Sequence, residues 1–168
     1  MSNWTNCRLL VVGPKTAVIR FARMARAKPC PVFAPDMLCG EGKDLTADRM
    51  ERVGPHQYQK CYQFQTADDD GIGHFQSISR IYPGINLLLV FADPNSGEVG
   101  SCFLHAGRAR HYILPGKKLD VIFTLHGYDH EADDNEVEYW EALGAAMDAA
   151  QAKLAPLLAR KHRSRRPQ

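Results

Sequence analysis

Two histidines and an aspartate lie close together in the second half of the chain and could bind a metal ion. His126, Asp129 and His130 follow a strand-like run, and such strand ends often hold functional side chains. Imidazole and carboxylate together suit zinc, manganese or iron, so the group could serve a metal-dependent hydrolase or nuclease. The alternative is a solvated acidic loop that caps the last helix. We prefer the loop. His126 and His130 would face the same side only on a helix, and Gly127 argues against a helix here.

A catalytic nucleophile cannot be identified from spacing. The chain has seven histidines and five cysteines, but sequence positions do not show which of them are neighbours in space. The glycine-rich phosphate loop, the dinucleotide fingerprint, the serine nucleophile elbow and the zinc-protease helix are all missing from the sequence. We therefore expect a non-enzymatic protein without a cofactor, unless a divalent metal binds at the histidines.

Positive charge is concentrated in the last nine residues. Without these cations, 16 basic residues remain against 19 acidic ones, so the rest of the chain is mildly acidic. Five phosphate contacts would give salt-sensitive, sequence-independent affinity for nucleic acid, and the alternative is a solubilising end of the last helix. We predict a single domain over residues 1–160 and a basic, disordered tail over residues 161–168. The candidate nucleic-acid-binding residues are Arg160, Lys161, Arg163, Arg165 and Arg166.

Carboxylates cluster in front of two predicted helices. At such positions they accept hydrogen bonds from free backbone amides and interact favourably with the helix dipole. Three adjacent aspartates could also hold a hard cation, but consecutive side chains cannot all face one ion, so we prefer capping. The same carboxylates could contact a basic host protein by imitating nucleic-acid charge, as an inhibitor of a defence system would. These protein-interaction candidates are Asp68, Asp69, Asp70, Glu131, Asp133 and Asp134.

The stretch from Tyr58 to Leu104 predicts a β-α-β-β unit around which the other elements pack. Its first strand, Tyr58–Thr66, alternates an aromatic face with a glutamine-rich face, which is typical of a strand with one wet side. We expect that aromatic face to pack against helices, which leaves it unable to stack on bases. The remaining parts of the unit are a helix to about Tyr82, a strand over Asn86–Ala92 and a return strand over Glu98–His105.

Apolar spacing predicts the other elements. The last helix has one apolar face, which we expect to dock on the core, although a homodimer through this helix could also form. Together the elements predict an α+β protein, a two-layer sandwich of a mostly antiparallel sheet with helices on one face and a long C-terminal helix. The elements are a strand at Cys7–Val12, a helix at Lys15–Lys28, a short helix from Thr46 to Val53, a loop at Gly107–Arg110, short strands at Tyr112–Leu114 and Leu119–His126, and a helix from Asp134 or Asn135 toward Arg160.

Two patches within residues 3–105 carry a resemblance to a known family, and their residues are Trp4 to Leu9, Gly13-Pro14, Phe21, Tyr62 to Ala67, Ile78, Tyr82-Pro83, Leu87 to Phe91 and Gly100. They resemble the YubB ferredoxin-like domain family of plasmid, phage and integrated-island proteins. The family's tryptophan and Pro-Pro after the Thr-Ala pair are replaced by Asp68-Asp69-Asp70-Gly71. The resemblance implies a ferredoxin-like sheet and a mobile-element setting, and it transfers no catalytic residues.

Composition fits an ordinary globular protein of 168 residues, with 45% hydrophobic and 24% charged residues. No apolar run is long enough to span a membrane, and the N-terminus lacks the features of a signal peptide. The five cysteines include no C-x-x-C pair, so we expect a reduced, cytoplasmic setting. These expectations combine into one hypothesis. The protein is a non-enzymatic accessory protein of a mobile genetic element that binds a macromolecule, either a host protein or nucleic acid.

Overall fold

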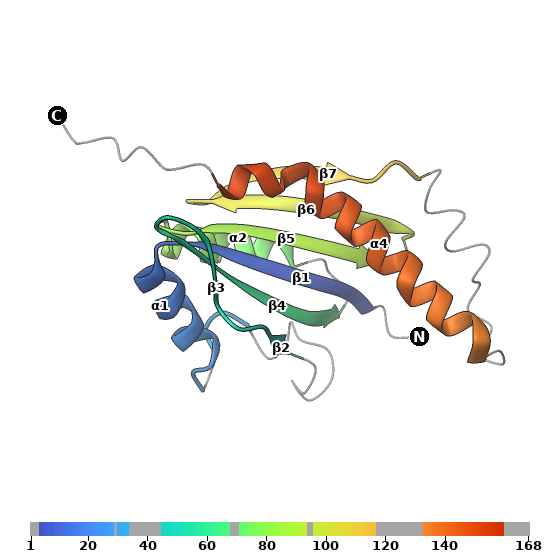
Figure 1. Ribbon diagram of the computed structural model, residues 1–168, viewed down its shortest axis with the longest axis horizontal. Coiled ribbons are helices and arrows are strands. Elements are labelled where there is room, and N and C mark those ends of the chain that lie inside the picture. Colours follow the sequence, from blue (N-terminus) through green and yellow to red (C-terminus); the bar gives the residue numbers. More distant parts are fainter. Residues whose placement is uncertain are drawn as a thin grey trace.

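The computed structural model describes residues 4–28, 30–33, 45–67, 71–93, 96–116 and 133–159. Seven strands within these ranges form one antiparallel sheet, with helices on both sides of it (Figure 1). The elements in chain order are β1 (Trp4–Gly13), α1 (Lys15–Ala25), β2 (Thr46–Ala47), β3 (Glu51–Gly54), β4 (Gln57–Ala67), α2 (Ile72–Ile81), β5 (Asn86–Asp93), β6 (Glu98–His105), β7 (Arg108–Ile113) and α4 (Asp133–Leu158).

β1 lies in the middle of the sheet, and both of its neighbours run antiparallel to it. β4 pairs with it along its whole length, from Trp4 opposite Ala67 to Gly13 opposite Tyr58, and β5 pairs on the other side. The strand order is β2-β4-β1-β5-β6-β7, with β3 also paired to β4. α2 therefore joins two parallel strands that have β1 between them, which is a split β-α-β unit. The predicted β-α-β-β unit is confirmed.

Side chains that alternate along the strands give the sheet two apolar faces. On β1, Leu9 and Val11 point to the side covered by α1 and α2, whereas Leu10 and Val12 point to the side covered by α4. β5 is buried on both sides, as its nearly unbroken apolar run predicted. On the aromatic face of β4, Tyr62 and Phe64 are buried, as expected, and Tyr58 is half-buried, so the rings of Tyr62 and Phe64 cannot stack on bases.

The α+β class and the antiparallel sheet are confirmed, and the open sheet is consistent with a ferredoxin-like sandwich. α1 and α2 cover one face, as predicted. α4 lies on the opposite face, so it adds a third layer over part of the sheet, a position that the sequence pattern did not specify. Its apolar stripe packs on this chain's own sheet, and a homodimer stays a prediction. None of the helices in the described ranges is long and apolar enough to cross a bilayer.

The predicted helix at Thr46–Val53 is wrong. The chain forms β2 and β3 there, and both strands pair with the outer side of β4. The spacing of Ala47, Met50 and Val53 suits a helix, but Val53 is 48% exposed, so a helical face would have had little core to cover. The open backbone groups of β4 decide the structure instead, because tertiary pairing overrides a weak local pattern.

The predicted loop at Gly107–Arg110 is also wrong, because β7 already begins at Arg108. A two-residue turn connects β6 to β7, and both of its residues have positive φ, 47° at Ala106 and 79° at Gly107. This is the pattern of a type I′ hairpin turn, which asparagine or glycine usually forms at the first position. Because alanine occupies this first position, at Ala106, the sequence did not predict the turn.

Candidate binding surfaces

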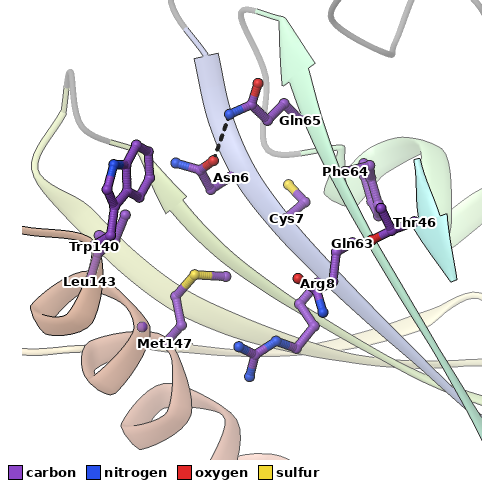
Figure 2. A pocket seen from close by; sticks show the side chains of 11 residues that line it. Asn6, Cys7, Arg8, Thr46, Gln63, Phe64, Gln65, Trp140, Leu143 and Met147 are labelled. Carbon is purple, nitrogen blue, oxygen red and sulfur yellow. Dashed lines mark hydrogen bonds between the residues drawn. The ribbon is translucent and has the colours of Figure 1, made fainter. Parts of the chain in front are cut away.

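A groove lies between α4 and the part of the sheet that α4 leaves uncovered. Its volume is about 560 Å³, within the usual range of ligand sites. β1, β2 and β4 supply one side of it, and the first half of α4 supplies the other (Figure 2). Its polar lining comes mainly from Asn6, Arg8, Gln63 and Gln65.

The alternation of β1 and β4 makes this part of the sheet polar. Asn6 and Arg8 on β1, and Gln63 and Gln65 on β4, are out of phase with the residues that fill the core beneath α1 and α2. They therefore point to the side of α4. α4 itself packs on β5 and β6, where the same side of the sheet is apolar. Amides and a guanidinium lose hydration in a dry interface, so the groove stays open where these groups stand.

Trp140 and Gly144 shape the α4 side of the groove. The indole of Trp140 is 46% exposed and meets the ring of Tyr139 edge-on, with 5.2 Å between ring centroids. One turn further along, Gly144 has no heavy atom within 4 Å of the position that a Cβ would take. A glycine inside a helix costs roughly 0.5–1 kcal/mol relative to alanine. α4 thus loses stability at a point where the missing side chain widens the groove.

Amide groups gather near Trp140. Gln65 Nε2 donates a hydrogen bond of 2.8 Å to Asn6 Oδ1, which uses one acceptor and one donor of the pair. The NH2 group of Asn6 and the carbonyl oxygen of Gln65 remain available to a ligand. Figure 2 shows this pair beside Trp140 at one end of the groove. Among the residues that the structure describes, the Gln63 amide has no protein partner, so it too can serve a ligand.

Arg8 connects the sheet to α4 at the other end of the groove. Its Nη1 donates to the carboxylate of Asp148 and, at 3.1 Å, to Oε1 of Gln151, both on α4. The Arg8 side chain is 24% exposed and that of Asp148 is 68% exposed. Because Asp148 balances the charge of Arg8, the groove attracts neutral groups better than anions.

Cys61, on the same side of β4 as the groove glutamines, is not an activated nucleophile. Burial raises the pKa of its thiol to about 11, and the nearby Asp48 carboxylate adds to the effect. The thiolate is the reactive form, so little of it exists at neutral pH. On the opposite side of the strand, burial lowers the pKa of Lys60, whose Nζ donates to the backbone carbonyl of Asp48. Within the described ranges this region is suited to binding and has no group prepared for catalysis.

A second surface is formed by cations at one end of the sheet. There β1 ends, β5 begins and β6 turns into β7. We call this surface the basic end. Its exposed cations, which come from four different elements, are Lys15, Arg52, Arg80, Arg108 and Arg110.

The β6–β7 turn fixes part of the basic end to α2. Gln76 Nε2 donates to the carbonyl of Gly107 at 2.8 Å, and the Gly107 N–H donates to Ser79 Oγ at 2.8 Å. A Cβ at Gly107 would collide with the stem of Arg80, so glycine allows that arginine to lie across the turn. Arg80 and Arg108 therefore stand on anchored backbone.

The opposite end of the sheet is acidic. Asp93 and Glu98 face each other there at the ends of β5 and β6. α4 begins at this end of the sheet (Figure 1). It finishes at the basic end, where Asn86 Nδ2 donates to the carbonyl of Leu158 at 2.9 Å. The molecule is thus polarised along its strands.

Most of the residues that the sequence singled out lie outside the described residues. Of the others, Asp133 and Asp134 form the start of α4, close to the predicted helix start. Among the described residues, no group of histidine, cysteine, aspartate and glutamate could hold a metal ion, so the hydrolase alternative stays a prediction. The candidates outside the described ranges are Arg160, Lys161, Arg163, Arg165, Arg166, Asp68, Asp69, Asp70, Glu131, His126, Asp129 and His130.

The sequence predicted neither surface. Its signals were present, since the glutamines of β4 were recognised as the wet side of a strand, and Trp140 and Gly144 interrupt the apolar stripe of α4 with an exposed ring and a missing side chain. No family model matches the chain, and neither the curated proteins nor the solved structures give a match. The resemblance to the YubB family stays a prediction.

Proposed function

We propose that this protein is a non-enzymatic binding protein that holds nucleic acid by its phosphate backbone at the basic end. The observation that best supports this is the separation of charge along the sheet. Arg80, Arg108 and Arg110 are exposed at one end, whereas Asp93 and Glu98 lie at the other. A polyanion is attracted by the first end and repelled by the second, so the charges would both hold it and orient it.

The sequence beyond α4 fits the same function. α4 ends at the basic end, and the cations from Arg160 onward follow it directly in the chain. They would add phosphate contacts to those of the folded surface. The role of accessory protein of a mobile genetic element rests on the family resemblance alone. Binding of a basic host protein by the acidic end is the competing proposal.

The test is the binding of labelled DNA and RNA, single-stranded and duplex, between about 50 and 200 mM salt. The test variant combines Arg80→Gln, Arg108→Gln and Arg110→Gln. Its matched control is an equal loss of charge from exposed positions at the other end of α1 and just beyond it, by Arg23→Gln, Arg26→Gln and Lys28→Gln.

The slope of log affinity against log salt should fall by about 2 to 3 in the test variant, because each lost phosphate contact contributes about 0.7 to 0.9. The control should keep the slope of the unchanged chain. A chain that ends at Ala159 should lose a further part of the slope. No binding at low salt, or an equal loss in the control, would overturn the proposal and make a protein partner the next candidate.

The metal-dependent hydrolase alternative has its own measurement. Protein purified without a histidine tag should be analysed for transition metals. A content far below one equivalent would reject a site at His126, Asp129 and His130, whereas a full equivalent would favour it.

A further inference from the structure

The groove beneath α4 is not explained by phosphate contacts, since it lies toward the acidic end of the sheet, away from the β6–β7 turn. Its Trp140 end is beside Asn6, which pairs with Ala92 near the acidic end. We propose that the groove binds one unpaired nucleobase, which stacks on Trp140 and hydrogen-bonds through its edge to the amides of Asn6 and Gln65. This inference rests on the proposed function for one source of the base, a nucleic-acid strand. A free nucleoside offers the same chemistry.

The charge of the lining favours a neutral ligand. Among the described residues that line the groove, Arg8 is the only ionised side chain, and it is paired with Asp148. A phosphate or carboxylate would have to displace that carboxylate before it could use the guanidinium. A nucleobase is neutral and needs no counter-ion.

The hydrogen-bonding groups match the edge of a base. The free NH2 group of Asn6 and the free carbonyl oxygen of Gln65 lie at the two outer ends of the bonded amide pair, where they present a donor and an acceptor (Figure 2). Base edges carry the complementary pair, and asparagine and glutamine amides are suited to adenine in this way. Gln63, whose amide has no protein partner within the described residues, can extend the same row.

The apolar side of the groove has room for a flat ring. Trp140 offers an exposed aromatic surface, on which any base can stack. Met147 adds a polarisable sulfur to the same lining, and sulfur packs well against rings. The open space at Gly144 lets a planar group approach the helix backbone closely.

An extended peptide fits the groove less well. Peptides that bind to sheets usually add a strand at a free edge, where backbone hydrogen bonds supply the affinity. β1 is paired on both sides, and the outer side of β4 is interrupted by its pairing with β3 at Gln57–Gln59 and with β2 at Tyr62–Gln63. The strands that floor the groove therefore offer no continuous edge within the described part of the chain.

The experiment is a calorimetric titration with adenosine, cytidine, adenosine monophosphate and a short single-stranded oligonucleotide. Gly144→Leu should fill the groove with its side chain, and the fold should tolerate it because a Cβ there meets no atom. The matched control is Ala149→Leu, which adds the same side chain at an exposed position of α4. Trp140→Ala removes the stacking surface, and circular dichroism checks that each variant is folded.

A nucleoside should bind the unchanged chain, and its monophosphate should bind no more than a few-fold tighter. Gly144→Leu and Trp140→Ala should each weaken binding by about tenfold or more, whereas Ala149→Leu should leave it unchanged. If the oligonucleotide depends on the basic end but no nucleoside binds, and Gly144→Leu is without effect, the base site is overturned and the proposed function stands. If nucleosides bind through the groove and the oligonucleotide shows no salt slope, the base site stands and phosphate binding is overturned.

Discussion

The side of the sheet that faces α4 has two halves. They differ in the polarity of their side chains and in whether α4 packs on them. Over β5 and β6 it presents buried apolar residues such as Leu88 and Val90, and α4 packs closely on them. Over β4 and the start of β1 it presents Asn6 and Gln63, and a groove remains. One helix passes both halves. The alternation along the strands, more than the pattern of the helix, therefore decides where α4 docks and where a site stays open.

Polar groups also behave differently in the two halves. In the covered half they are buried and bound to the backbone of α4. Ser101 Oγ donates to the carbonyl of Ala150 at 2.7 Å, and Asn86 donates to that of Leu158. In the open half, by contrast, amide groups keep donors and acceptors that no described residue uses. Polar groups in the first half hold the helix, and those in the second half can serve a ligand.

The largest expected effect separates the two halves by stability. Leu88→Ala should lower the free energy of unfolding by about 2–5 kcal/mol, because the side chain is fully buried beneath α4 and its loss leaves a cavity. Gln63→Ala in the open half should change it by less than about 0.5 kcal/mol. Urea denaturation measures both. Equal losses would show that the halves do not differ as described.

A smaller effect of opposite sign is expected at Gly144. Gly144→Ala should raise the free energy of unfolding by about 0.5–1 kcal/mol, since alanine favours a helix and its Cβ meets open space. The control is Gly107→Ala, which should destabilise the fold because φ is +79° there and the Cβ would collide with Arg80. Thermal unfolding distinguishes the two. A loss of stability at Gly144 would mean that the groove is narrower than the structure shows.

A third effect, which appears only at high pH, concerns Cys61 in the open half. Burial raises the pKa of its thiol from 9.0 to about 11, so the folded chain keeps this proton to higher pH than the unfolded chain. Between these two values the unfolded state binds fewer protons, and the free energy of unfolding falls as pH rises. Cys61→Ser should lack that part of the fall.

Urea titrations of the unchanged chain and of Cys61→Ser at pH 9 and pH 11 measure the difference. The lowered pKa of Lys60 acts in the opposite direction. Between that lowered pKa and the ordinary lysine value of 10.5, Lys60 holds its proton more often in the unfolded chain than in the folded chain, so this contribution raises the free energy of unfolding as pH rises. That contribution occurs in both proteins and cancels in the comparison, except for the weak charge interaction between Cys61 and Lys60. If the free energy of unfolding changed equally with pH in both proteins, the raised pKa of the Cys61 thiol would be contradicted.

Sequence patterns predicted the parts of the fold that depend on local alternation. The wet and dry sides of β4, the buried run of β5 and the apolar stripe of α4 all follow from side chains a few residues apart. The face on which α4 docks could not be predicted, because both faces of the sheet are apolar at β1. Short strands such as β3 could not be predicted either, since pairing with the neighbouring edge of β4 stabilises them more than their own residues do.

The groove was beyond sequence analysis for a different reason. Its lining comes from β1, β4 and α4, and no spacing in the chain connects Asn6 with Gln65 or with Trp140. Each of these residues has an ordinary interpretation in its own segment. Only the pairing of β1 with β4 and the crossing of α4 bring their polar and aromatic groups to one place.

The central position of β1 also has a consequence for how the chain folds. β1 is made first, but Cys7 meets its partner Thr66 only 59 positions later, and Arg8 meets Asp148 only after 140. Contacts between such distant positions require long loops to close, which places folding in the slower range of small proteins. Until β4 and β5 have been synthesised, a strand that is apolar on both faces has no neighbour. A nascent chain of this protein therefore depends on whatever shields that strand during synthesis.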